Sequence, residues 1–494
     1  MYRDRITVRT AYLKLSTSSR KVIIMGKKTK AQELREKLFY KRQNSGLTMT
    51  EEEIRACDEY CEGYKTFLSA SKIEREAVKN TVAIAEKKGF IPFEESMELH
   101  PGDRVYLNNR GKAVIFAVIG EKDVSEGVRI VAAHIDSPRL DLKQNPLFEN
   151  EELCYFKTHY YGGIKKYQWG AVPMALHGVI AKADGTVIDV NIGEDEGDPV
   201  FVVTDLLPHL APEQMKRPAT EIIRGEELNL LIGSRPFRDD EASEKTKLAI
   251  MEILCEKYGI TEADLLSAEL DAVPAGKARD IGFDRSMIGG YGQDDKVCAY
   301  TAFSALMDMT EYNKLPERTA VVILADKEEI GSMGNTGLRS SFLRYFIEDI
   351  AAAFGRTGRY VLSRSECLSA DVNAALDPTF PDVNEKNNSC FINYGICLTK
   401  FTGARGKYDT SDASAEFVAK MRKLFDDNGI IWQTGELGKV DCGGGGTVAQ
   451  YIADLNVDTV DLGVPVLCMH APFEIAAKND IYAGYKAYKA FMAQ

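Results

Sequence analysis

The sequence predicts an α/β fold, in which helices cover both faces of a mixed sheet, with a β-rich segment inserted near the middle of the chain. From residue 286 onward, amphipathic helical stretches alternate with short, continuously apolar runs such as residues 319–325. Apolar strands that alternate with helices are typical of a sheet buried on both faces. Between residues 142 and 283, alternating runs and frequent turn signals indicate a β-rich insert instead.

Size and composition exclude several classes of protein. The chain has 494 residues, of which 45% are apolar and 28% charged, as in ordinary globular proteins of two or three domains. It has no run of 18 apolar residues, so we expect no membrane span. The net charge is −12, and an acidic chain lacks the cationic surface that nucleic-acid binding needs. We therefore expect neither a membrane nor a nucleic-acid partner.

The N-terminus and the cysteines bear on where the protein resides. Residues 1–24 hold six basic residues and one acidic residue but no apolar core, which argues against a secretory signal. We expect a disordered extension, or a start at Met25, with an organelle transit peptide as the alternative. The ten cysteines include no C-x-x-C pair and no dense framework. That spacing indicates reduced thiols and a cytoplasmic location.

The predicted elements follow in chain order. Residues 28–86 repeat apolar side chains at three- and four-residue spacing, which indicates helices. Residues 103–119 and 127–138 are β-type runs. In the second half, residues 295–309 and 341–354 are predicted helices and residues 319–325 a strand. Further strand-like runs are residues 360–372, 390–401 and 457–470.

Several residues able to bind a metal follow these strand-like runs. They are His134, the Glu328–Glu329 pair, Asp371 and His470, while Asp294 begins a helical run. Each alone has an ordinary explanation as a hydrogen-bonded loop residue or a helix cap. Active sites of open α/β sheets lie at the carboxyl ends of strands, so these residues are expected to meet. Two histidines and three carboxylates together suit a pair of zinc or similar divalent ions.

Two further patterns concern the surroundings of such a site. Asp136 is two residues from His134, and on an extended segment both side chains face one side. Asp136 can therefore hold the second ring nitrogen of His134. The Cys442–Gly446 run, CGGGG, lacks the spacing of a phosphate-binding loop. Its glycines are expected to let the backbone approach a ligand or another strand closely.

Five motifs in order give the chain a resemblance to a known family. They are AHIDSPRLDLK, GQDDKVCAYTAF, DKEEIGS, LSADV and DLGVPVLCMHAPFEIA. Together they resemble the metal-site motifs of the aspartyl aminopeptidase and vacuolar aminopeptidase I family, over a match from about residue 30 to the end. The resemblance implies a mixed-sheet α/β/α metallopeptidase catalytic domain at residues 25–141 and 284–494. Residues 142–283 would be an inserted dimerisation domain.

The resemblance also implies a mechanism and a role for each site residue. Two divalent ions, zinc or else cobalt or manganese, would be held by His134, Asp294, Glu329, Asp371 and His470. Asp294 would bridge the ions, Glu328 would be the general base, and Asp136 would orient His134. His209 resembles a histidine that reaches an active site from the insert, often that of a neighbouring subunit. Peptides would be the substrates, and the family assembles as homo-oligomeric tetrahedral dodecamers.

One departure and two alternatives stay open. Asp295 stands where the family commonly has Asn after its bridging aspartate, which suggests a bacterial branch preferring neutral residues. Lys400, Arg405 or Lys407 could meet the substrate. The first alternative function is a related amidohydrolase acting on N-acyl amino acids. The second is a scaffold that lost its chemistry, although no base or ligand is missing from the motifs.

Overall fold

The computed structural model describes residues 28–239, 241, 243–309 and 315–494, so the N-terminal extension at residues 1–24 lies outside the described residues. The chain divides into two units, residues 1–42 and 43–494. The described part of the first contains helix α1 (Lys30–Leu38), whose N-cap Thr29 forms a capping box with Gln32. All the elements below belong to the second unit.

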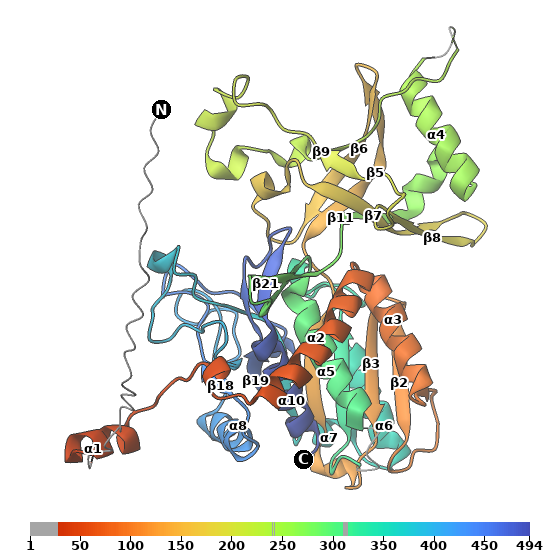
Figure 1. The fold of residues 1–494 in the computed structure, drawn as a ribbon. Helices are drawn as coiled ribbons and strands as arrows, with labels where there is room; N and C mark the ends of the chain where they lie inside the picture. The colour runs from red at the N-terminus through yellow and green to blue at the C-terminus, as the bar shows by residue number, and fades with distance from the viewer. Residues whose placement is uncertain (1–27, 240, 242, 310–314) are drawn as a thin grey trace, which may run out of the picture. The chain divides into compact units, whose positions relative to one another are not determined.

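A nine-stranded mixed sheet organises the second unit (Figure 1). Its strands, in spatial order, are β1 (Ile91–Pro92), β2 (Arg104–Asn109), β3 (Ala113–Val118), β14 (Ala320–Ala325), β4 (Arg129–His134), β15 (Glu366–Ser369), β19 (Asp458–Gly463), β17 (Ile396–Thr399) and β18 (Trp432–Thr434). The central strands β14, β4, β15 and β19 run parallel, whereas β3 is antiparallel to both of its neighbours and β17 is antiparallel to β19. The predicted mixed-sheet α/β fold is confirmed.

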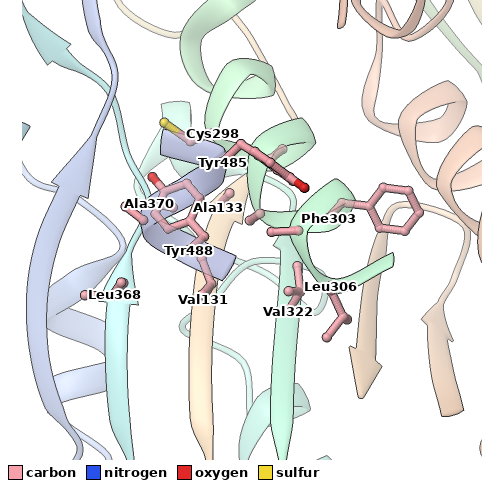
Figure 2. Packing of buried hydrophobic residues seen from close by; sticks show 14 of the residues in the cluster. Val131, Ala133, Cys298, Phe303, Leu306, Val322, Leu368, Ala370, Tyr485 and Tyr488 are labelled. Atoms are coloured by element: carbon pink, nitrogen blue, oxygen red, sulfur yellow. The ribbon is translucent and has the colours of Figure 1, made fainter. Parts of the chain in front are cut away.

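Helices bury both faces of this sheet, because alternate residues of one strand enter two different apolar clusters. Val131 and Ala133 of β4 pack with helices α2 (Glu51–Ala70), α3 (Glu74–Lys87), α5 (Gln293–Met309), α8 (Ala415–Asp427) and α10 (Lys478–Met492). Ile130 and Ala132 pack with α6 (Phe342–Ala353), α7 (Gly358–Leu362) and α9 (Ala449–Ala453). Figure 2 shows the first face, where Tyr485 and Tyr488 of α10 and Phe303 of α5 lie over the strands.

A second sheet of seven strands occupies most of the predicted insert. Its order is β11 (Ala268–Pro274), β5 (Arg139–Asn150), β6 (Leu153–Tyr161), β10 (Asn229–Gly233), β9 (Phe201–Val203), β7 (Pro173–Ala181) and β8 (Val187–Ile192). All its pairings are antiparallel, and β7 also pairs with β11 and β9, so the ladder closes on itself. Trp169 and the strand residues fill its own core, against which helix α4 (Lys245–Tyr258) packs.

A third, five-stranded sheet contains β12 (Arg279–Ile281), β13 (Met287–Gly290), β21 (Glu474–Ala477), β20 (Pro465–Leu467) and β16 (Asn373–Ala374). The prediction of one strand over residues 457–470 is therefore wrong. The run breaks at Val464, so β19 belongs to the nine-stranded sheet and β20 to the small one. The run 360–372 is also shorter than predicted, because Tyr360–Leu362 ends helix α7 and only Glu366–Ser369 is strand.

Among the described residues, no helix combines the length and the apolar character that crossing a bilayer requires.

Candidate metal centre

The carboxyl ends of three parallel strands bring four of the candidate residues to one edge of the large sheet. His134 is the last residue of β4, and Asp371 comes two residues after β15. Glu328 and Glu329 begin a short 3₁₀ turn after β14. The chain enters that turn through Lys327, which has a φ of 67°, and the carboxylate of Glu328 lies 3.9 Å from Nε2 of His134.

The five-stranded sheet supplies the remaining two residues. Asp294 follows β13, and His470 follows β20. Asp294 and Asp295 are assigned to α5, but their dihedral angles are not helical and the peptide between them is cis. They therefore do not act as the first turn of a regular helix.

These side chains converge on Asp294. Its Oδ1 lies 3.2 Å from Nε2 of His134, and its Oδ2 lies 3.2 Å from Nε2 of His470. Asp371 Oδ1 is 4.0 Å from the His134 nitrogen, and Glu329 Oε2 is 3.5 Å from the His470 nitrogen. Two groups of three potential ligands result, His134–Asp294–Asp371 and Asp294–Glu329–His470, each with its atoms within 4.8 Å of one another. Asp294 is common to both.

The donor set fits cations better than it fits an ordinary hydrogen-bond network. The buried oxygens Asp294 Oδ1 and Glu329 Oε1 have no hydrogen-bond partner among the described residues. An unpartnered buried carboxylate oxygen is costly, and a bound ion removes that cost. Histidine nitrogens and carboxylate oxygens together are ligands that zinc accepts.

Asp136 lies behind the candidate ligands and contacts four groups. Its carbonyl and its Oδ1 lie 3.1 and 3.3 Å from Nδ1 of His134. Its carboxylate also accepts the backbone N–H groups of Glu328 and Glu329 at 3.1 and 3.2 Å and the hydroxyl of Tyr161 at 2.8 Å. One buried carboxylate thus fixes a histidine ring and the backbone of the glutamate pair.

Crowded carboxylates shift the protonation of the centre. Burial raises the pKa of Glu328 to about 7 and holds the pKa values of Glu329 and Asp371 well above their ordinary range. Burial opposes charging of His470, but Asp294 and Glu329 outweigh it and raise its pKa to about 10. Without cations this acidic group holds protons, and divalent ions would replace them.

The centre opens into a cavity of about 760 Å³. Its floor includes Asp294, Glu328, Glu329, Asp371 and His470, and its walls include Gly444–Gly446 and Tyr451. A Cβ on Gly444 would lie 1.9 Å from the carbonyl oxygen of Gly403. The CGGGG run therefore makes the close backbone approach that the sequence predicted, beside this cavity.

Other predicted contacts lie apart from the cavity in this chain. His209 is exposed and is not among the residues that line the cavity. Lys400 and Lys407 both pair with Asp412.

Sequence reasoning missed Glu474, whose carboxylate accepts the backbone N–H groups of His470 at 2.8 Å and Asp294 at 3.2 Å. The sequence did hold one sign of its role, because Glu474 lies in the motif DLGVPVLCMHAPFEIA, four residues after His470.

The fold and this group of side chains place the chain in the class of metal-dependent peptidases. It belongs to the aminopeptidase I zinc metalloprotease family (M18), which matches residues 67–492. It is therefore a hydrolase of the aminopeptidase class, and the family predicted from the five motifs is confirmed.

Relatives and solved structures agree with this membership. A probable M18 family aminopeptidase 1 of Clostridium acetobutylicum is 51% identical over 437 residues, which is 87% of this chain and 93% of the relative. A Thermotoga maritima protein of the same name is 45% identical over 91% of this chain and 98% of its own length. The crystal structure of aminopeptidase I from Clostridium acetobutylicum superposes with a TM-score of 0.87 at 46% identity, covering 92% of this chain and 100% of that one.

Proposed function

We propose that this aminopeptidase uses two divalent ions held by the two groups of ligands that share Asp294. His134 and Asp371 would complete one site, and Glu329 and His470 the other. The observation that supports this most strongly is that each carboxylate oxygen of Asp294 faces a different histidine nitrogen at 3.2 Å. A carboxylate in that position can bridge two ions.

Glu328 is the proposed general base. Its carboxylate is 3.9 Å from Nε2 of His134, it lines the cavity, and it belongs to neither group of ligands. Bound ions would polarise the scissile carbonyl and acidify the attacking water. Glu328 would take the proton from that water and pass it to the leaving amine. Burial raises the pKa of Glu328 to about 7, and cations beside it would counteract that rise and favour the charged carboxylate that accepts the proton.

The amidohydrolase alternative makes a different demand on the substrate. An aminopeptidase requires a free α-amine, whereas an N-acyl amino acid hydrolase requires that amine to be blocked. Release of amino acid from aminoacyl substrates, compared with their N-acetylated forms, separates the two functions. A panel of acidic, neutral and basic N-terminal residues also tests the preference for neutral residues suggested by Asp295.

The base is tested by Glu328→Gln, which keeps the size of the side chain but cannot accept the proton. We expect zinc binding to persist and turnover to fall by at least about 10²-fold. Glu317→Gln is the matched control, because Glu317 is half-exposed and pairs with Lys122. Equal hydrolysis by the Glu328→Gln variant and wild type would contradict the assignment of Glu328 as the general base.

Dialysis against chelator, followed by addition of zinc, cobalt or manganese, identifies the ion that supports turnover.

We also propose that residues 142–283 form a dimerisation domain within a homo-oligomer, which could be a tetrahedral dodecamer. Leu206, Leu207, Leu210 and Met215 are each at least half exposed and surround His209 in sequence. An exposed apolar group of this size is typical of an interface. A solved yeast relative described as a dodecamer shares the fold at 21% identity and a TM-score of 0.71, over 88% of this chain and 96% of its own. Mass photometry tests the assembly, and Leu207→Glu should weaken it.

If a second copy of the chain covers the 206–215 segment, His209 would approach the cavity of that copy and contact the substrate there. His209→Ala should then raise KM without weakening zinc binding.

A cytoplasmic location is proposed because all ten cysteines are unpaired. Fractionation of the source cells tests it.

A further inference from the structure

Strand β6 of the seven-stranded sheet ends against the metal centre, at a segment of three residues that we call the 161–163 segment (Tyr161, Gly162 and Gly163). The Tyr161 hydroxyl donates to Oδ2 of Asp136 at 2.8 Å. That same oxygen accepts the backbone N–H of Glu329. A side chain of the second sheet thus fixes the carboxylate that holds the glutamate pair.

The Tyr161 ring is itself held by a buried cation. The guanidinium of Arg139 lies 4.1 Å from the ring centroid and forms ion pairs with Glu74, Asp141 and Asp271. Burial, with the nearby Asp136 carboxylate, raises the pKa of Tyr161 far above its ordinary value. Tyr161 therefore keeps its proton and acts as a donor to Asp136.

The two glycines of the segment contact the other metal group. The carbonyl of Gly163 lies 2.7 Å from Nδ1 of His470. Because a carbonyl can only accept, Nδ1 carries a proton, and Nε2, which faces Asp294 and Glu329, is the nitrogen that a bound ion would use. Gly162 has a φ of 75°, and a Cβ there would lie 3.1 Å from Oε2 of Glu329. Any larger residue here would strain the backbone and push Glu329 by a few tenths of an ångström.

We propose that the 161–163 segment is a positioning element of the metal centre, through which the seven-stranded sheet sets the geometry of both metal groups. Tyr161 orients Asp136, which in turn holds His134 and the glutamate pair. Gly163 selects the tautomer of His470, and Gly162 leaves room for Glu329. These are positioning residues, because they act through other side chains. The inference rests on the proposed function in taking those side chains as ligands and base.

The first test is Tyr161→Phe, which removes the hydroxyl but keeps the ring over Arg139. Its control is Tyr488→Phe, because Tyr488 is also a buried tyrosine and donates one hydrogen bond, to the carbonyl of Leu462 at 2.6 Å, in the apolar cluster of Figure 2. Zinc affinity is measured in the metal-free full-length protein by competition with a chromophoric chelator. We expect Tyr161→Phe to bind zinc about 10-fold more weakly than the control and to lose about 10-fold in kcat with little change in KM.

The second test is Gly162→Ala, and its control is Gly185→Ala. Gly185 belongs to the same sheet region and has a φ of 90°, but a Cβ there meets nothing within 4 Å. Both variants therefore share the backbone strain of a positive φ, and only Gly162→Ala presses on Glu329. We expect zinc affinity to fall by about 10-fold or more in Gly162→Ala alone.

The outcomes separate this proposal from the proposed function. Zinc affinities equal to those of the two controls would overturn the positioning role, whatever the activities. A wild type that binds zinc but releases no amino acid would instead overturn the aminopeptidase chemistry. In that case the zinc affinities of the four variants still decide whether the segment positions the ligands.

Discussion

The carboxylate of Asp136 accepts the backbone N–H of Glu328 at 3.1 Å, although the two residues are 192 positions apart in sequence. Asp136 lies two residues after the end of β4, and Glu328 begins the turn after the neighbouring parallel strand β14. The hydrogen bond therefore ties the proposed base to the strand that carries His134, a proposed ligand.

We predict that Asp136→Asn lowers kcat by about 10–100-fold, the usual cost of altering a group that orients metal ligands. An amide has one acceptor oxygen and two N–H donors. In one orientation the amide nitrogen of the new side chain would face the N–H of Glu328. In the other orientation it would face the N–H of Glu329 and the hydroxyl of Tyr161. Either way, the asparagine loses some of the hydrogen bonds that Asp136 accepts. Steady-state kinetics of the zinc-loaded enzyme measure the loss. Asp189→Asn is the control, since Asp189 is exposed and pairs with Lys79; a similar small effect in both variants would contradict the prediction.

Metal removal should lower the thermal stability of the chain. Two of the proposed ligands, Asp294 and Glu329, each have a buried carboxylate oxygen without a hydrogen-bond partner, and zinc that binds only the folded state stabilises it. Free zinc at 100 times the dissociation constant contributes about 2.7 kcal/mol. Differential scanning calorimetry with chelator and with zinc measures the shift in Tm.

The matching variant for that experiment is Asp371→Asn, which removes one charge from the His134 group. We expect it to reduce the zinc-induced rise in Tm. Asp377→Asn offers a control on a nearby loop outside both metal groups. A zinc response of wild-type size in Asp371→Asn would remove Asp371 from the ligand set.

Much of the fold could be predicted from sequence because burial leaves a local pattern. The continuously apolar run of β14 and the run ending at His134 are buried on both faces, and their alternation with helices indicated an α/β sheet covered on both faces. The break at Val464 left no such pattern. Gly463 and Pro465 flank it, but the run stays apolar beyond them, and the pairing with two different sheets is not visible in the sequence.

The residues of the site could also be predicted only where they follow a local sequence pattern. Strand ends indicated where His134, Glu328 and Asp371 would lie, because parallel strands finish at one edge. The contact of Tyr161 with Asp136 could not be predicted, because Tyr161 ends an alternating strand of the insert like many others. Its role depends on how that strand meets the large sheet. His209 stays a prediction, because its proposed partner is a second copy.

The pH dependence of stability should report on His177, which joins the seven-stranded sheet to helix α3. Its Nδ1 lies 2.7 Å from Glu76 of α3, and its Nε2 lies 3.2 Å from Glu194, which also pairs with Lys72. Burial opposes charging, but the two carboxylates outweigh it and raise the pKa of His177 from 6.5 to about 9. Because the folded-state pKa is raised, this stabilisation is fully present below pH 6.5 and is lost as pH rises through 9.

We therefore expect His177→Gln to be less stable than wild type at pH 6, by on the order of 2 kcal/mol, with the difference shrinking toward pH 10. Urea unfolding of both proteins across this range gives the difference at each pH. His100→Gln serves as the control, since His100 is exposed. A gap between wild type and His177→Gln that stays constant from pH 6 to 10 would show that the ion pairs are not its cause.

We predict that Gly463→Ala weakens the metal centre, although Gly463 is not itself a proposed ligand. Gly463 ends β19, and a Cβ there would lie 1.6 Å from the carbonyl oxygen of Asp371 and 3.0 Å from the Cα of Val372. Both neighbours are backbone atoms, so relief of the overlap must move Asp371 itself. We expect a loss of about 1–3 kcal/mol in stability, as for other overpacked sites, together with weaker zinc binding. Gly197→Ala is the control, because a Cβ at Gly197 meets nothing within 4 Å. Thermal unfolding and chelator competition measure the two effects, and wild-type zinc affinity in a destabilised Gly463→Ala protein would show that Asp371 tolerates the shift.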